Sequence, residues 1–286
     1  MPSKIPGHDS LALALRAAAR TYAVEIETQL ERAGQGHHTG VHRARKALAR
    51  LRALLSLLHA APASVTHLEQ RARAIAHELS RLRDAQAAHG MARRLARSKS
   101  NGDLREAWGP AIDSLEANRD RLLKNGVRAD PGLSAQQERF AVLGAELDAH
   151  EWIAATPAHI KSALHRSVRR TRRARKNARA TSSQETRHRL RRRMRRLLLQ
   201  IQLLETIAED QRHPLAAKQA HKLVARESKH HRMRKRLVDN LGDERDLYLL
   251  RQTLKGQRHS DAASPLLSLI DKRLSKTIAA SDKLID

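Results

Sequence analysis

The chain has 286 residues, which is enough for one large domain or two of ordinary size and for a substantial hydrophobic core. Lys and Arg total 56 against 30 Asp and Glu, so the formal net charge is +26 with the 17 His residues counted as neutral. The absence of cysteine excludes disulfides, a Cys nucleophile, iron–sulfur clusters and Cys-based zinc modules. Repulsion at this net charge destabilises a compact chain, so the composition favours a protein with an anionic partner.

Apolar residues recur at three- and four-residue spacing along nearly every long segment, and only 2% of the residues are aromatic. This pattern predicts packed helices rather than a β-sandwich or a β-barrel. Gly, Pro and capping residues separate the helical segments. In chain order, we expect helices over residues 10–32, 41–59, 66–98, 103–125, 134–152, 157–179 and 182–210, followed by two that begin near 214 and 264.

Pro131 and Gly132 form the strongest break in the chain, and we place a boundary there between segments 1–130 and 131–286. The short loops between the expected helices favour antiparallel neighbours. The predicted fold is therefore all-α, with two antiparallel four-helix bundles.

Two blocks of sequence occur once in each predicted half, in the same order. The first begins with His, followed by Arg after three and eight residues and Leu after nine; its copies start at His42 and His188. The second is Leu-x-x-x-Arg-Asp, at 79–84 and at 241–246. This ordered duplication predicts two homologous halves, and the bundles are then expected to be related by internal pseudo-two-fold symmetry.

The two His-Arg blocks also share a helical pattern. On a helix of 100° per residue, each copy places Leu and other apolar residues on one stripe and its basic residues on the opposite side. Between Lys161 and Arg196, 16 of 36 residues are Lys or Arg, and Glu185 is the one acidic residue. Pairing within the helices cannot neutralise this segment, so the basic sides are expected to face an anion.

The His-x-x-Arg-x-x-x-x-Arg-Leu-Arg run from His42 resembles the signature of the CHAD family, the conserved-histidine α-helical domains. The copy from His188, the Arg-rich segment 169–173 and the block at 241–246 resemble the family's later motifs in the same order, so the resemblance spans about 10–285. It implies that both halves form one CHAD domain that binds inorganic polyphosphate. The binding residues expected from the resemblance and from the basic helix faces are His42, Arg45, Lys46, Arg50, Arg52, Arg169, Arg170, Arg173, His188, Arg191, Arg192, Arg195 and Arg196.

The individual residue types leave alternatives open. His42 and His188 could donate to phosphate, make a structural hydrogen bond at the bundle surface or bind a metal. Asp84 and Asp246 each follow an Arg, and we expect them to be salt-bridge or capping partners rather than catalysts. No P-loop motif is present, and the basic segments are almost free of the carboxylates that hold divalent metals.

The sequence therefore predicts a non-catalytic protein with no cofactor and no bound metal, whose partner is long-chain polyphosphate. Enzymes of polyphosphate metabolism and polyphosphate granules would be further partners. A nucleic-acid-binding protein is the main alternative, which the scarcity of aromatic rings disfavours, and a phosphoanhydride hydrolase is the second. No apolar run approaches the length of a membrane span, so we expect a soluble, cytoplasmic protein.

Overall fold

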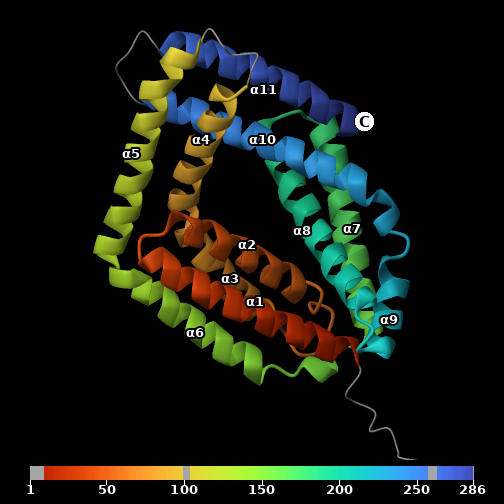
Figure 1. The fold of residues 1–286 in the computed structure, drawn as a ribbon. Coiled ribbons are helices and arrows are strands. Elements are labelled where there is room, and N and C mark those ends of the chain that lie inside the picture. The colour runs from red at the N-terminus through yellow and green to blue at the C-terminus, as the bar shows by residue number, and fades with distance from the viewer. Residues whose placement is uncertain (1–9, 99–103, 257–262, 286) are drawn as a thin grey trace, which may run out of the picture.

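The computed structural model describes residues 10–98, 104–256 and 263–285 (Figure 1). In these ranges the regular structure is helical throughout, without a strand, and the all-α prediction is confirmed. The α-helices are α1 (Leu11–Gly34), α2 (His38–Leu55), α3 (Thr66–Glu78), α4 (Ser80–Ala96), α5 (Arg105–Ala129), α6 (Ser134–Ala149), α7 (Pro157–Ala180), α8 (Gln184–Glu209), α9 (Pro214–Val224), α10 (His231–Gly256) and α11 (Ala263–Ile285). Three single turns of 3-10 helix join them: η2 (Pro131–Leu133), η3 (Trp152–Ala154) and η4 (Ser228–His230).

Several helices begin at residues that satisfy or remove the free N–H groups of a first turn. The Ser10 hydroxyl accepts a hydrogen bond from the third residue of α1. Thr156 and His159 form a capping box at the start of α7. Pro157 and Pro214 occupy the first positions of α7 and α9, where a missing N–H has no consequence.

The long helix expected over residues 66–98 is two helices, and this prediction was wrong. α3 ends at Glu78, Leu79 has a ψ of 2°, and α4 starts anew at Ser80. The carbonyl of Ala76, which an unbroken helix would use for its own ladder, accepts hydrogen bonds from the Ser80 hydroxyl and from the guanidinium of Arg45 in α2. Contacts from another helix thus accompany the break, and the periodicity of one segment cannot show them.

Smaller differences occur at other helix ends. α5 continues past Asn125 and Gly126 to Ala129, and the expected start at Asp103 lies outside the described residues. α6 begins at Ser134 as expected, and the carboxylate of Asp130 accepts hydrogen bonds from the Ser134 hydroxyl and the Ala135 N–H. α2 stops at Leu55, four residues short of the expected end.

The helices pack around three groups of buried side chains. The largest group joins α1, α2, α3, α6 and α9 to one end of α7 and α8. A second joins α4 and α5 to α10 and α11, and a third joins α7 and α8 to α10 and the end of α11. The first two groups contain helices from both sides of residue 130, whereas the third contains only helices that follow it. The division into two pseudo-symmetric bundles stays a prediction.

α1 and α2 pack closely against each other, and glycine permits the approach. A Cβ on Gly40 would lie 2.6 Å from the backbone nitrogen of Ala33 and 2.7 Å from the carbonyl oxygen of Gln29. Gly40→Ala is therefore expected to separate the helices and to lower the free energy of unfolding by about 1–3 kcal/mol, measured by denaturant titration. Gly90→Ala, with open space around it in α4, should be neutral or stabilising; equal losses would contradict this account.

Candidate functional site

The two His-Arg motifs meet in the folded chain. α8 packs against both α2 and α10, and α10 packs against α4. The arginines of the two Leu-x-x-x-Arg-Asp blocks, Arg83 and Arg245, lie close to these motifs. The resulting central basic group consists of His42, Arg45, Arg83, His188, Arg191, Arg195 and Arg245.

Arg83 is the common neighbour in this group. Its charge lowers the pKa of both histidines and of the other four guanidinium groups. Burial is the larger cause at each of these six residues, because it removes water from the charged form. The central basic group therefore holds several mutually repelling charges away from solvent.

Asp84 and Asp246 join the two halves crosswise. Arg83 donates to its neighbour Asp84 at 2.9 Å and to Asp246 of α10 at 3.1 Å. In return, Arg245 of α10 donates to Asp84 at 3.1 Å. Both carboxylates are thus ion-pair partners, as the sequence predicted, and they hold α4 against α10.

Arg45 and Arg191 occupy equivalent positions in the two copies. The Arg45 guanidinium donates to the hydroxyl of Ser80 at 2.9 Å, and this residue follows the Leu of the first Leu-x-x-x-Arg-Asp block. Arg191 lies against the corresponding residue, Gly242, where a Cβ would be 3.2 Å from its Nη2. Glycine leaves no hydroxyl here, and the buried Nε of Arg191 has no hydrogen-bond partner in the described part of the chain.

The central basic group lacks enough negative charge. Burial and the repulsion of neighbouring arginines lower the pKa of Arg45 and of Arg191 to about 10. Arg195 is surrounded in the same way, and its pKa is lowered by burial, Arg83 and Arg245. Five guanidinium groups share two carboxylates among the described residues, so the central basic group has an excess of positive charge.

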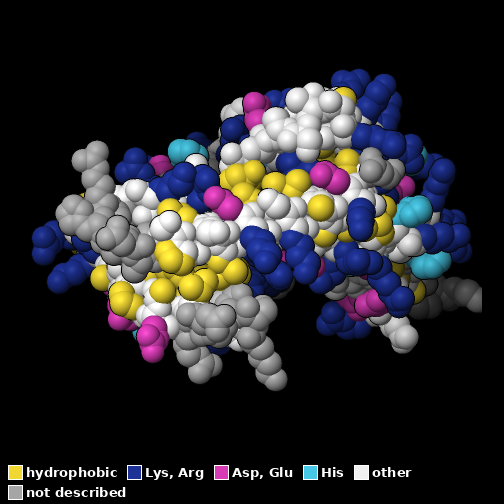
Figure 2. Space-filling view, turned by 90° about the horizontal axis from the view of Figure 1, so that it is seen from above, with side chains coloured by type: hydrophobic (Ala, Val, Ile, Leu, Met, Phe, Trp, Pro, Cys, Tyr) yellow, Lys and Arg dark blue, Asp and Glu magenta, His cyan; other side chains and the backbone are white. Residues whose placement is uncertain are grey.

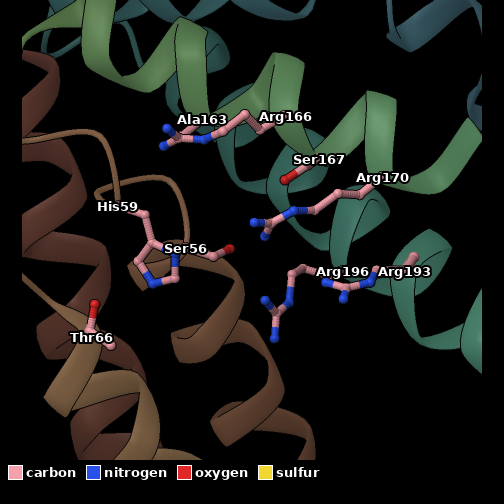
Figure 3. A pocket seen from close by; sticks show the side chains of 9 residues that line it. All are labelled: Ser56, His59, Thr66, Ala163, Arg166, Ser167, Arg170, Arg193 and Arg196. Atoms are coloured by element: carbon pink, nitrogen blue, oxygen red, sulfur yellow. The ribbon is translucent and has the colours of Figure 1, made fainter. Parts of the chain in front are cut away.

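A second basic cavity lies between the α2–α3 connection, α7 and α8 (Figure 3). We call it the α7 pocket; its volume is about 230 Å³. It is lined by Ser56, His59, Thr66, Ala163, Arg166, Ser167, Arg170, Arg193 and Arg196. Four guanidinium groups and a histidine thus border one small space.

Glu69 is the acidic residue next to the α7 pocket. Its carboxylate accepts a hydrogen bond from Arg196 at 2.6 Å and lies 3.0 Å from the ring nitrogen of His59 and 3.5 Å from Arg52. These partners hold the pKa of Glu69 at about 2, against the opposing effect of burial. Glu69 is therefore ionised at neutral pH and offsets part of the charge on Arg52 and Arg196.

The binding residues predicted from the sequence are divided between the central basic group, the α7 pocket and other positions on the helices. Five of them, His42, Arg45, His188, Arg191 and Arg195, belong to the central basic group, and Lys46 and Arg192 are within electrostatic reach of its histidines. Arg170 and Arg196 line the α7 pocket, which Arg52 joins through Glu69. Arg50 instead pairs with Glu25 of α1 at 2.9 Å. Arg169 and Arg173 are exposed on α7 and line neither place, so their role stays a prediction.

The central basic group and the α7 pocket also contain five basic residues that were not predicted from the sequence: Arg83, Arg245, Arg166, Arg193 and His59. A signal was present for the first two, because the repeated Leu-x-x-x-Arg-Asp block contains them. The other three carry no motif that would separate them from a solvated helix surface.

The match to a protein family is broad. The model of the CHAD domain family matches residues 14–255 of the chain. The chain belongs to the CHAD domain family. This confirms the resemblance read from the two His-Arg motifs.

A solved CHAD domain shows the same fold. The crystal structure of the CHAD domain from the plant Ricinus communis aligns with a TM-score of 0.57 and 16% sequence identity, over 96% of this chain and 91% of that one. No curated protein matches the sequence. Among its described residues, this CHAD chain has no helix long and apolar enough to cross a membrane, and no group of three or more His, Asp or Glu side chains placed to hold a metal ion.

The two histidines of this CHAD domain should couple anion binding to protons. Burial and the charges of Arg245, Arg192, Arg191 and Arg83 lower the pKa of His188 to about 4, so it is neutral in the free protein at pH 7. A bound polyanion favours the imidazolium and raises that pKa. If the central basic group binds a polyanion such as long-chain polyphosphate, binding should therefore take up protons, and the affinity should increase as the pH falls from 7 towards 5.

Calorimetry at pH 6 in buffers of different ionisation enthalpy measures this uptake. We expect a positive uptake for the natural chain and a smaller one for the His42→Gln, His188→Gln variant. Long chains keep the contribution of titrating end groups small. Equal uptake by both proteins would contradict the assignment of the protons to these histidines.

Proposed function

We propose that this CHAD domain binds inorganic polyphosphate at the central basic group, without catalysing a reaction on it. The observation that carries the proposal is the convergence of both His-Arg motifs, with Arg83 and Arg245, on one partly buried place with too few carboxylates. Isolated basic helix faces would be solvated, whereas these guanidinium groups repel one another in a site of low solvation.

The chemistry of arginine suits a phosphate polymer. A guanidinium stays charged at neutral pH even when burial lowers its pKa to about 10, as at Arg45 and Arg191. It donates paired, charge-assisted hydrogen bonds to neighbouring phosphate oxygens. Figure 2 shows Lys and Arg side chains spread over one face of the molecule, where Asp and Glu occur as small separate patches. Such a distribution favours approach of a long polyanion.

Nucleic acid is the weaker candidate because few aromatic side chains are accessible for base stacking. Trp108, Phe140 and Trp152 are buried in the core. Of the two tyrosines, Tyr248 lines a cavity with His188, while Tyr22 packs against the largest group of buried side chains. A single ring beside the site does not make a platform for successive bases.

The arrangement also favours binding over hydrolysis. Hydrolysis of a phosphoanhydride uses carboxylates to hold divalent metal. The two carboxylates in the central basic group, Asp84 and Asp246, already accept hydrogen bonds from Arg83 and Arg245. They neutralise arginines and hold helices together. Attachment to polyphosphate granules, or presentation of the polymer to enzymes that act on it, would follow from binding alone.

Competition between long-chain polyphosphate and duplex DNA across a salt series tests the proposal. We expect polyphosphate to bind more tightly at physiological salt, and log affinity to fall linearly with log salt for both ligands. Equal affinity for DNA would overturn the ligand assignment. Release of inorganic phosphate from the polymer with magnesium or manganese would overturn the non-catalytic role.

A further inference from the structure

The α7 pocket differs from the central basic group in shape. Its lining approaches from three sides, with His59 and Ser56 facing Arg170 and Arg166 of α7, and α8 closing the third side (Figure 3). Its volume of about 230 Å³ is below that of sites for drug-sized ligands, which begin at roughly 300 Å³. Its size suits one compact group rather than the passage of a long polymer.

The charges in this pocket are also less well paired. Among the described residues, Arg166, Arg170 and Arg193 take part in no ion pair within 4.0 Å. One terminal nitrogen of Arg166 is buried without a hydrogen-bond partner. Burial, Arg196 and Arg170 lower the pKa of Arg193. The pocket therefore gathers cations that lack an anion, with hydroxyl groups of Ser56, Thr66 and Ser167 beside them.

The carboxylate of Glu69 is an anionic group that basic side chains beside the α7 pocket already bind. Its carboxylate already lies between Arg196, Arg52 and His59 at one side of the pocket. The guanidinium of Arg196 is thus oriented for anionic oxygens before any ligand binds. A group with several charged oxygens could meet the remaining arginines while Glu69 keeps its contacts.

The pocket and the central basic group lie on neighbouring sides of α8. At 100° per residue, Arg192 lies between Arg191 on one side and Arg193 on the other. Its charge affects both His188 of the central basic group and Arg193 of the pocket. Arg192 thus lies between the α7 pocket and the central basic group. An anionic chain that starts in the pocket can contact Arg192 on its way to the central basic group.

We propose that the α7 pocket binds the terminal phosphate of a polyphosphate chain, whose following units lie on the central basic group. This inference rests on the proposed function. A terminal phosphate carries more charge than an interior unit, about 1.5 to 2 negative charges at neutral pH, and presents three oxygens that bear no second phosphorus. A small pocket lined on three sides by unpaired guanidinium groups and hydroxyl groups fits such an end better than an interior unit.

Linear tripolyphosphate and cyclic hexametaphosphate separate end recognition from general attraction to charge. The ring carries the greater total charge but has no end. We expect calorimetry at about 150 mM salt to give at least ten-fold tighter binding of the linear trimer. Equal or tighter binding of the ring would overturn the proposal.

A double variant locates the effect. Arg166→Ala with Arg170→Ala should weaken binding of the linear trimer by about ten-fold or more and leave binding of the ring nearly unchanged. The matched control is Arg172→Ala with Lys176→Ala, which removes the same charge from exposed positions of α7 that do not line the pocket. Equal losses in both variants would show diffuse attraction and not a pocket.

A measurement on the natural chain needs no variant. The terminal and central phosphorus atoms of tripolyphosphate give separate ³¹P resonances, and we expect the terminal resonance to shift more on binding. A larger shift of the central resonance would contradict end binding. If long-chain polyphosphate itself fails to bind, the proposed function fails; if it binds while ring and linear trimer behave alike, the end-binding proposal alone fails.

Discussion

A variant with both Arg191→Ala and Arg195→Ala is expected to bind long-chain polyphosphate about a hundred-fold more weakly than the natural chain. These arginines are partly buried on α8, and no carboxylate of a described residue pairs with either. Each would donate charge-assisted hydrogen bonds to phosphate in a place of low solvation, where such bonds are strongest. Titration with a polymer of defined length measures the loss.

The control for this variant is again Arg172→Ala with Lys176→Ala, which lowers the net charge equally. We expect a loss of a few-fold at most, from reduced long-range attraction. Similar losses in both variants would mean that total charge, rather than the central basic group, determines binding.

The same substitutions should stabilise the unliganded protein. Burial and neighbouring arginines both lower the pKa of Arg195, which means that its charged form is disfavoured in the folded state. Its removal relieves this repulsion, so the thermal midpoint should rise while binding is lost. A fall in the midpoint would indicate that Arg195 has a structural partner in the fold.

The second large effect concerns stability and not binding. Arg187→Ala is expected to lower the free energy of unfolding by about 3–5 kcal/mol, because it leaves a buried carboxylate without its partner. Arg187 of α8 donates to both oxygens of Glu244 in α10, at 2.8 and 2.7 Å, and also pairs with Asp282 of α11. The side chains of Arg187 and Glu244 are only 5% and 4% exposed. Urea denaturation followed by circular dichroism measures the change.

Arg189→Ala provides the comparison for Arg187→Ala. Arg189 is two residues away on α8 and pairs with Glu185 at 2.8 Å, but its side chain is 51% exposed. Its loss should change stability by about 0.5 kcal/mol or less. Equal effects of the two variants would contradict the importance of burial.

The helices were predictable wherever the apolar residues of one segment determine them. The Leu stripe of the His42 motif, for example, is buried in α2, with Leu48, Leu51 and Leu55 in the core. The break at Leu79 was not predictable, because it goes with a hydrogen bond from Arg45 in another helix to Ala76. Local periodicity contains no information about such a partner.

The site was predictable in part for a similar reason. The repeated motifs identified His42, Arg45, His188 and Arg191, since duplication marks residues that a helix surface alone would not. Whether two basic helix faces meet depends on how α2, α8 and α10 pack, which no single segment specifies. For the same reason Arg50, which has the right spacing, pairs with α1 instead.

The crosswise pairs of Arg83 and Arg245 with Asp84 and Asp246 join positions more than 160 residues apart in the chain. Contacts of such sequence separation form only after both ends of the chain have folded and docked, because the intervening chain must first lose its freedom. The residues of the central basic group are therefore expected to acquire their neighbours late in folding. A polyanion that recognises the finished arrangement would select the fully assembled molecule and protect it against local opening.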